Sequence, residues 1–232
     1  NDEFNYFLIL EHGGKPYYKH VIQCHELIKR DLLSVNEYQR HTKSIFYQMA
    51  TYLHFLHTKC NICHLDISLE NFVIKHSKLK RGKFTNDGRV GYIDYGLSEC
   101  FKNGKSFKTQ KFKVGKPGYK SREIYCETEY DARYADIWSL GVCLFVMIIG
   151  ERPWTRPSYV DNSFSNIMNG YLKQLLIDNQ KWGFIDKSGY DLLTKIFVKE
   201  SKRINIDGIL KHNYLQSVNI VVHKKPKSKL NG

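Results

Sequence analysis

The chain has 232 residues, 42% of them hydrophobic and 25% charged, and a formal net charge of +13. This size and composition support one sizeable hydrophobic core, and the longest apolar run, Val142 to Ile149, is far too short to cross a bilayer. The six cysteines are irregularly spaced and no signal peptide opens the chain, so we expect an intracellular, cytoplasmic protein with reduced thiols.

Periodicity predicts one long helix and two short strands in the first half of the chain. Ser34 and Glu37 form a capping box that opens the helix. Its apolar residues recur at helical spacing, which predicts one buried face. They are Tyr38, Ile45, Met49, Tyr52, Leu53 and Leu56. Strands are predicted at 72–74 and 90–93, and the polar, glycine-containing insertion 76–88 between them is predicted to be a surface hairpin.

The second half of the chain is predicted to be helical. Helices are expected around residues 135–149, 164–169, 171–179, 189–198 and 206–210. The first of these contains the longest apolar run, so we expect it to be a buried central helix. The tail, residues 221–232, is polar and basic, and we expect it to fray.

The residues that carry chemistry lie in His64-Leu65-Asp66-Ile67-Ser68-Leu69-Glu70-Asn71 and, further along, in Asp94-Tyr95-Gly96. A carboxylate, an amide five residues later and a second carboxylate before a glycine form a set that can hold a metal ion and nucleotide phosphates. In this order, the two segments resemble the protein-kinase catalytic loop and the metal-binding Asp-Phe-Gly motif of that family.

Further segments resemble the same family in the same order. They are Gly115 to Glu123 (the G-T-P-G-Y-x-A-P-E segment), Asp136 to Gly141 (the start of the central helix), Pro153-Trp154 (the loop after it) and Lys202-Arg203-Ile204. The last of these implies an architectural ion pair between Arg203 and Glu123. The resemblance implies a mainly α fold, the C-terminal lobe of a divergent serine/threonine kinase, with a central buried helix and short β-hairpins at the catalytic loop.

The resemblance divides the chain into residues 1–14 (last small-lobe strand and hinge), 15–220 (C-terminal lobe) and 221–232 (basic tail). The sequence contains neither a G-x-G-x-x-G loop nor the strand lysine of the small lobe, parts that cover and position the nucleotide phosphates. We therefore expect a fragment that is inactive alone. Its apolar surface near Tyr95 would need the missing small lobe or a partner to cover it.

The resemblance also implies the roles of the chemical residues in phosphoryl transfer from ATP to a protein Ser/Thr hydroxyl. Asp66 would orient the attacking hydroxyl and accept its proton, while Asn71 and Asp94 would hold Mg²⁺. His64 would be structural, packed beneath Tyr95 and tied through its imidazole to the carboxylate of the central helix.

The nucleotide base would be bound at the start of the chain. Leu10 corresponds to the gatekeeper position, and the backbone of Glu11 and Gly13 would meet the adenine edge. Val73 would form the floor beneath the base, although a plain core position explains this valine equally well.

The departures from the family pattern concern charge at the site. Leu65 replaces the arginine that receives an activation-loop phosphate, Ser68 replaces a lysine, and Lys116 replaces a threonine. The last two positions are neighbours in the family, so Lys116 is a candidate catalytic cation in a compensating swap. The alternative is a degraded site with a solvated Lys116.

The positive charge is concentrated in three segments. They are the segment after Gly96 (Lys102, Lys105, Lys108, Lys111, Lys113, Lys116, Lys120), the insertion (Lys78, Lys80, Arg81, Lys83) and the tail (Lys224, Lys225, Lys227, Lys229). Solvated loops explain the last two. Positions that are acidic in kinases with arginine-directed specificity are here Lys15 and Val146, leaving only Glu70. A protein substrate that is not strongly basic is therefore the better prediction.

Other functions remain open at this point. A pseudokinase or scaffold module is favoured by Ser68 and the missing lobe, but the retained Asp66, Asn71 and Asp94 argue against it. Specific nucleic-acid binding is disfavoured because the lysines accompany no recognisable reading motif. The string Cys60-Asn61-Ile62-Cys63-His64 fits haem attachment, or half of a zinc site, but no second ligand pair occurs.

Overall fold

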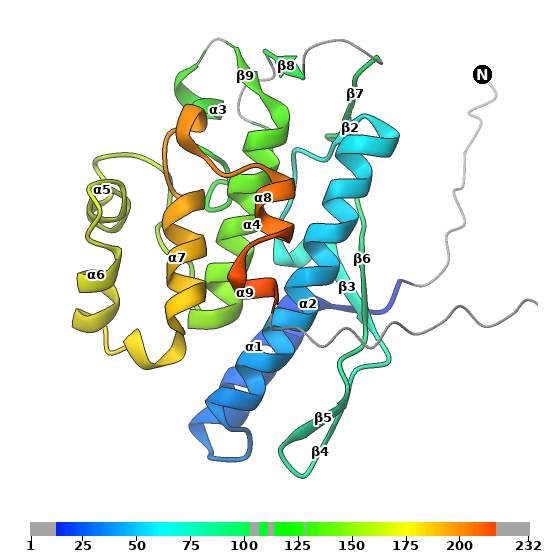
Figure 1. Cartoon of the computed structure of the whole chain (residues 1–232), viewed down its shortest axis with the longest axis vertical. Coiled ribbons are helices and arrows are strands. Elements are labelled where there is room, and N and C mark those ends of the chain that lie inside the picture. The colour runs from blue at the N-terminus through cyan, green and yellow to red at the C-terminus, as the bar shows by residue number, and fades with distance from the viewer. Residues whose placement is uncertain (1–12, 103–106, 111–113, 128, 217–232) are drawn as a thin grey trace, which may run out of the picture.

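The computed structural model describes residues 13–102, 107–110, 114–127 and 129–216, which form a mostly helical body (Figure 1). Its α-helices are α1 (Tyr17–Lys29), α2 (Val35–Phe55), α3 (Glu123–Cys126), α4 (Ala132–Ile149), α5 (Asn162–Met168), α6 (Leu172–Asp178), α7 (Lys187–Ile196), α8 (Ile206–Leu210) and α9 (Asn213–Gln216). Single turns of other helix types occur at Leu56–Cys60 (π) and at Leu69–Asn71, Trp182–Phe184 and Glu200–Lys202 (3₁₀).

The strands pair in small antiparallel sheets. They are β1 (Lys15–Pro16), β2 (Ile62–Cys63), β3 (Phe72–Lys75), β4 (Lys78–Lys80), β5 (Lys83–Asn86), β6 (Arg89–Tyr92), β7 (Glu99–Cys100), β8 (Lys108–Thr109) and β9 (Tyr130–Asp131). β3 lies between β1 and β6, while β2 pairs with β7, β4 with β5 and β8 with β9. β3 and β6 match the two predicted strands to within one residue.

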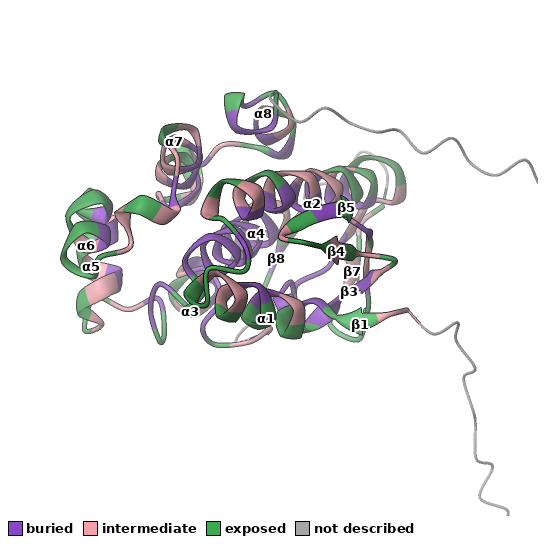
Figure 2. Cartoon of the chain, turned by 90° about the horizontal axis from the view of Figure 1, so that it is seen from below, coloured by how far each residue is buried: buried purple, intermediate pink, exposed green. Residues whose placement is uncertain are grey.

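Helix α4 forms the core. The Asp131 side chain caps its start by accepting a hydrogen bond from the backbone of Arg133 at 3.0 Å, and Gly150 ends it with a φ of 90°. By length and composition α4 could cross a membrane, but 89% of that stretch is buried inside the fold. Figure 2 shows this buried helix enclosed by α1, α2 and α7. A helix that is apolar all round belongs in the interior, so the predicted central helix is confirmed.

Helix α2 begins at the predicted cap. Ser34 Oγ accepts a hydrogen bond from the backbone of Glu37 at 3.2 Å, but the reciprocal half of the capping box is not formed. The Glu37 carboxylate instead accepts a hydrogen bond from the backbone of Phe84 at 2.7 Å. The predicted apolar face is buried except at Tyr52, which is 37% exposed.

Helix α1 is absent from the helices predicted above. Its buried residues Tyr17, Val21 and Cys24 are spaced at helical intervals, and Pro16 directly precedes it. Proline at a helix start and this spacing are both sequence signals of a helix. The surface hairpin, in contrast, is confirmed as β4 and β5. Its two-residue turn has φ angles of 48° at Arg81 and 72° at Gly82, as type I′ turns require.

Candidate active site

The loop from His64 to Asn71 is held on the core helix by one carboxylate. Asp136 of α4 accepts hydrogen bonds from the backbone N–H groups of His64 and Leu65, each at 2.8 Å. Leu65 has a φ of 62°, a left-handed conformation that costs a non-glycine residue about 1–3 kcal/mol. A buried group in the centre of the fold therefore holds a strained loop in place.

His64 lies against Tyr95, as the family resemblance implies, with ring centroids 4.9 Å apart. The expected tie between its imidazole and Asp136 is wrong, because that tie runs through the His64 backbone. The His64 imidazole Nε2 is instead 3.2 Å from the carbonyl oxygen of Ile93. The imidazole next to Asp136 belongs to His57, whose Nε2 lies 3.0 Å from Asp136 Oδ2. His57 was not predicted, and its only signal is an imidazole near the end of the predicted helix.

The side chains of His57, Cys63 and Asp136 come close enough to raise the question of a metal site, since their ligand atoms lie within 4.8 Å of one another. Both Asp136 oxygens already accept hydrogen bonds, from His57 and from two backbone N–H groups. Burial also raises the pKa of the Cys63 thiol far above its ordinary value. Zinc binds thiolates and carboxylate oxygens that have free lone pairs. The Cys63 thiol is protonated and the Asp136 oxygens are already hydrogen-bonded, so we interpret these residues as a structural contact.

Asp66 and Asn71 form the centre of the site. The 3₁₀ turn Leu69–Asn71 directs the Asn71 side chain back towards Asp66. Asn71 Nδ2 donates to Asp66 Oδ2 and to the Asp66 carbonyl oxygen, both at 2.8 Å. Asp66 Oδ1 is buried, and no described residue donates a hydrogen bond to it. This oxygen is therefore the acceptor at the site that a substrate proton could use.

Gly115 brings the segment before α3 against the catalytic loop. Its φ is 79°, and a Cβ atom at this position would lie 2.7 Å from the Leu65 carbonyl oxygen. A contact below 3.0 Å with backbone leaves room for glycine only, and left-handed φ favours glycine as well. The next residue, Lys116, is thereby placed beside the loop.

Lys116 reaches into the centre of the site. Its Nζ lies 2.9 Å from Ser68 Oγ, 3.0 Å from Asn71 Oδ1 and 3.4 Å from Asp66 Oδ2. The lysine side chain is 37% exposed, whereas that of Asp66 is 11% exposed. The cation thus lies next to the residue at which kinases of the Ser/Thr type carry their own lysine. A fully solvated Lys116 does not describe this geometry.

Asp94 follows the strand that is bonded to the catalytic loop. The backbone N–H of Ile93 donates to the Asn71 carbonyl oxygen at 2.9 Å. Asp94 is the next residue along the chain. It is exposed, its φ is 63°, and its Oδ1 accepts a hydrogen bond from the backbone of Gly96 at 3.3 Å. The carboxylate is therefore exposed, and it follows directly on the residue whose backbone is bonded to Asn71.

Two of the predicted base-binding residues are in contact. A Cβ atom on Gly13 would lie 2.9 Å from Val73 Cγ2, so the Gly13 backbone packs directly on the Val73 side chain. Val73 is 7% exposed and pairs with Pro16 of β1 and Gly91 of β6. The other two predicted residues, Leu10 and Glu11, lie outside the described residues.

The side chain of Leu65 occupies an apolar cluster, which we call the Leu65 cluster. Its buried members are Cys63, Leu65, Ile124, Tyr130, Ala132 and Ala135, and partly buried Phe101, Phe107 and Val114 pack against them. Leu65 is 4% exposed. The segment after Gly96 is therefore fastened to the catalytic loop by apolar contacts at the position where an arginine would hold a phosphate.

Two hydroxyl groups in the described part of that segment also have structural partners. Thr109 is buried and its Oγ1 donates to Glu99 Oε2 at 2.7 Å. Ser98 Oγ donates to the His64 carbonyl oxygen at 3.2 Å. Both hydroxyls bond to residues of the catalytic loop or of the segment itself.

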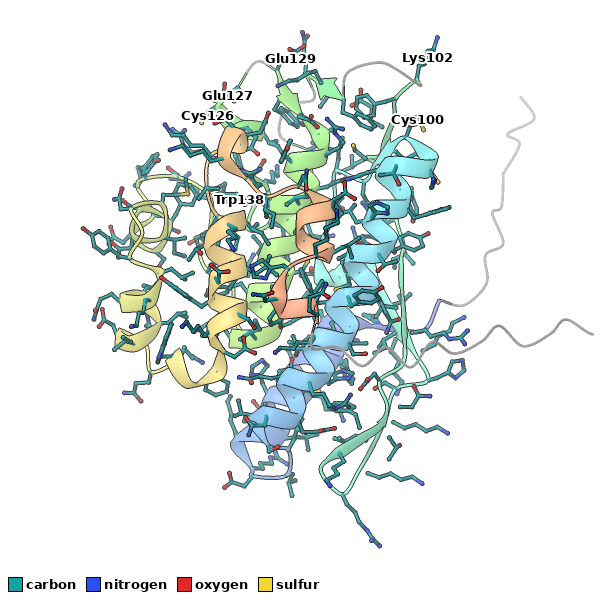
Figure 3. All side chains as sticks on the ribbon, viewed as in Figure 1. Cys100, Lys102, Cys126, Glu127, Glu129 and Trp138 are labelled. Atoms are coloured by element: carbon teal, nitrogen blue, oxygen red, sulfur yellow. The ribbon has the colours of Figure 1, made fainter. Side chains whose placement is uncertain are left out.

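The predicted ion pair between Glu123 and Arg203 is confirmed and buried. The Arg203 guanidinium also donates to the carbonyl oxygens of Ile196, Tyr134 and Val198. It stacks over the Trp138 ring at 4.8 Å. Figure 3 shows Trp138 inside the fold, whereas the labelled Cys126, Glu127 and Glu129 point outward from the rim above it.

An apolar surface lies beside Tyr95, as predicted. Its large side chains are between 37% and 50% exposed, and they are Tyr52, Phe55, Ile93, Tyr95 and Leu97. The hydroxyl groups of Tyr52 and Tyr95 are 3.1 Å apart. Contiguous exposed apolar side chains of this size mark an interaction surface.

The chain is similar to known proteins over most of its length. Residues 1–215 match the model of the protein kinase domain. The serine/threonine-protein kinase SRK2J of Arabidopsis thaliana is 31% identical over 75% of this chain and 47% of that protein. Serine/threonine-protein kinase SAPK6 of Oryza sativa subsp. japonica is 31% identical over 81% of this chain and 48% of that protein. Serine/threonine-protein kinase CHK1 of Saccharomyces cerevisiae is 28% identical over 73% of this chain and 30% of that protein. The chain thus spans less than half the length of these relatives.

Proposed function

Because the chain belongs to the protein kinase family, we propose that it is the catalytic lobe of a serine/threonine protein kinase, which transfers the γ-phosphoryl group of ATP to a protein hydroxyl. The three relatives described above carry serine/threonine kinase in their names. Phosphoryl transfer requires positioning and charge stabilisation more than covalent chemistry. The observation that carries the proposal is the group formed by Asp66, Asn71 and Lys116.

Asp66 is the group that orients the attacking hydroxyl. Its Oδ2 is held by Asn71 Nδ2 at 2.8 Å, while its buried Oδ1 has no partner among the described residues. A hydroxyl that donates to Oδ1 would be oriented for attack, and the carboxylate would accept its proton as the phosphoryl group is transferred.

Asn71 and Asp94 are the residues that would hold Mg²⁺. An amide oxygen and an exposed carboxylate on neighbouring segments are hard oxygen ligands of the kind that Mg²⁺ prefers. When bound, the metal supplies positive charge that neutralises the phosphate oxygens. Asn71 Nδ2 donates to the Asp66 backbone, and Asn71 Oδ1 accepts from Lys116 Nζ at 3.0 Å, so the amide oxygen would bind the metal through its second lone pair.

Lys116 would provide the cation next to the transferred group. Its contact with Ser68 at 2.9 Å supports the compensating swap, in which a lysine from the segment before α3 serves the position that the loop has lost. A preorganised cation in a partly buried site stabilises the charge that develops in the transition state.

The base of ATP would lie against Gly13 and Val73, with Leu10 and Glu11 completing that side. In kinases a small lobe covers the nucleotide from the other side. The exposed apolar surface beside Tyr95 would be the contact area for such a lobe. We therefore propose that the chain is part of a longer protein and that these 232 residues alone have negligible activity. We also propose an intracellular, cytoplasmic location, since all six cysteines are free thiols.

The substrate is proposed to be a protein segment that is not strongly basic. At the two positions that would favour arginine when acidic, the chain has an exposed Lys15 and a buried Val146. A cation and an aliphatic side chain cannot pair with arginine. Of the three positions that would contact such an arginine, Glu70 alone carries a carboxylate.

The test is a kinase assay on the longer protein that includes the small lobe. Replacing Asp66 by Asn should lower kcat by about 10²–10⁴-fold with little change in KM for ATP, as for the loss of a general base. Asp178→Asn, at an exposed position of α6, is the matched control and should leave kcat unchanged. Parent protein that binds a partner but transfers no phosphate would favour the scaffold alternative, which the loss of lysine at Ser68 supports. An Asp66→Asn enzyme with the parent rate would refute the proposed mechanism.

A further inference from the structure

A groove lies between α1 and the segment that leads into the β4–β5 hairpin. It has a volume of about 980 Å³. One wall consists of residues at the start of the described chain and along α1, namely Gly14, Lys15, Pro16, Lys19, His20, Gln23, Cys24 and Leu27. The other wall consists of Ile74, Lys75, His76, Ser77 and Leu79. Figure 1 shows the hairpin beside the lower ends of α1 and α2, away from the catalytic loop.

The β4–β5 hairpin, which contributes Leu79 to this wall, is fastened to α2 through β5 and the residues that follow it. The Phe84 ring stacks on the His41 ring, with centroids 3.7 Å apart and planes 6° apart. Arg40 donates to both Asp87 oxygens, at 2.8 and 3.0 Å, and Glu37 accepts from the Phe84 backbone at 2.7 Å. A groove held open in this way needs little ordering when a ligand binds.

The rim of the groove is cationic. Lys15 and Lys19 are exposed on one wall and Lys75 lies on the other, and no Asp or Glu is among the described residues that line the groove. The carboxylates of Glu37 and Asp87 are close in the fold but are already paired with Arg40. Lys15 and Lys19 therefore make this part of the rim positive among the described residues that line the groove.

The floor of the groove is apolar and neutral. Cys24, Leu27, Ile74 and Leu79 line it, and Cys24 is 2% exposed. Burial, with the nearby His41 and Lys15, lowers the pKa of His20 to about 4, so this imidazole is neutral at physiological pH. Aliphatic side chains could be buried against this floor.

We propose that the groove is a docking site for an acidic, extended segment of a partner protein, with aliphatic side chains on the floor and carboxylates at Lys15 and Lys19. The apolar floor favours a peptide over a nucleic acid, whose phosphates would use only the cationic rim. The chain's own residues 217–232 contain four lysines and no acidic residue, so charge repulsion disfavours them as the occupant. The groove shares Lys15 with the proposed specificity positions but contains none of Asp66, Asn71 and Lys116, so binding of the peptide does not depend on phosphoryl transfer.

The test is a titration of the 232-residue chain with a short fluorescent peptide that carries glutamate at alternate positions and leucine between them. A second peptide with glutamine in place of glutamate is its control. Lys15→Glu/Lys19→Glu should raise the Kd by at least about tenfold, which is 1.4 kcal/mol. Lys80→Glu/Lys83→Glu makes the same change in net charge at exposed hairpin positions outside the groove and should leave the Kd within about twofold. The single variant Lys19→Ala should also raise the Kd, by less than the double variant does.

Circular dichroism of each variant establishes that the fold is retained, as expected for exposed lysines. Equal losses of affinity in both double variants would overturn the proposal, since they would indicate non-specific attraction to net charge. Equal binding of the glutamine peptide would also overturn it. Displacement of the peptide by a duplex oligonucleotide, with the same dependence on Lys15 and Lys19, would assign the groove to nucleic acid instead.

Discussion

The position of Lys116 allows a quantitative prediction about catalysis in the longer, active protein. Its Nζ lies within 3.4 Å of oxygen atoms of Asp66, Ser68 and Asn71, so it is a preorganised cation at the carboxylate that we propose to be catalytic. Removing one such contact from a partly water-excluded site typically costs about 2.7 kcal/mol, or about a hundredfold in kcat. We expect Lys116→Ala to lower kcat by this amount.

A second substitution separates the swap from a general effect of charge. In the Lys116→Ala enzyme, Ser68→Lys should restore part of kcat, because Ser68 Oγ lies 2.9 Å from Lys116 Nζ and a lysine there could serve the same site. Lys102→Ala is the matched control, since Lys102 is exposed in the same basic segment and points outward in Figure 3. Its kcat should equal that of the parent.

Initial rates at saturating ATP, with circular dichroism to establish folding, measure these effects. A Lys116→Ala enzyme within about twofold of the parent would refute the reasoning, because 0.4 kcal/mol is too small for a cation at the transferred group. Failure of Ser68→Lys to restore any activity would limit the role of Lys116 to holding the loop.

Three further predictions concern regulation and stability. Replacing Ser98 and Thr109 by alanine should leave kcat of the longer protein nearly unchanged, because their hydroxyls have structural partners. A hundredfold loss of kcat in a folded double variant would instead indicate that a phosphate on one of them is essential. The His20 pKa is lowered to about 4 by burial and by a neighbouring imidazole and lysine, so the unfolded chain binds a proton that the folded chain excludes between about pH 6.5 and 4. Stability should therefore fall by about 2 kcal/mol from pH 7.5 to 5 in urea unfolding, and His20→Asn should remove most of this loss; an unchanged pH dependence in the variant would contradict the assignment. Arg203→Met should destabilise the fold by roughly 3–5 kcal/mol, because it leaves the buried Glu123 carboxylate unpaired, and adding Glu123→Leu should recover part of the loss.

The local parts of the site could be predicted from the sequence. Asp66 and Asn71 are five residues apart, so one short turn is enough to bring them together. The approach of Lys116 to Ser68 spans 48 residues, and it was predictable only because the two positions are neighbours in the family that the motifs resemble. The composition of the chain contains no such information.

Contacts between distant segments could not be predicted in the same way. His57 is 79 residues from Asp136, and a lone imidazole at the end of a helix gives no sign of its partner. The packing of the hairpin on α2 depends on Arg40 and Asp87, which are 47 residues apart. Charged side chains in a polar insertion predict solvent exposure, so this salt bridge and the groove beside it became visible only in the folded chain.

The Leu65 cluster also determines how the segment after Gly96 should respond to its surroundings. An ionic clamp between a phosphate and a guanidinium weakens in salt, since the Debye length shrinks to about 3 Å at 1 M. Apolar contacts are not screened in this way; sulfate strengthens them and cooling weakens them. We therefore expect this segment to be held more firmly in sulfate and to loosen in the cold. Temperature and solvent would thus control its attachment, whereas the attachment of a phosphorylated segment is controlled by a kinase and a phosphatase.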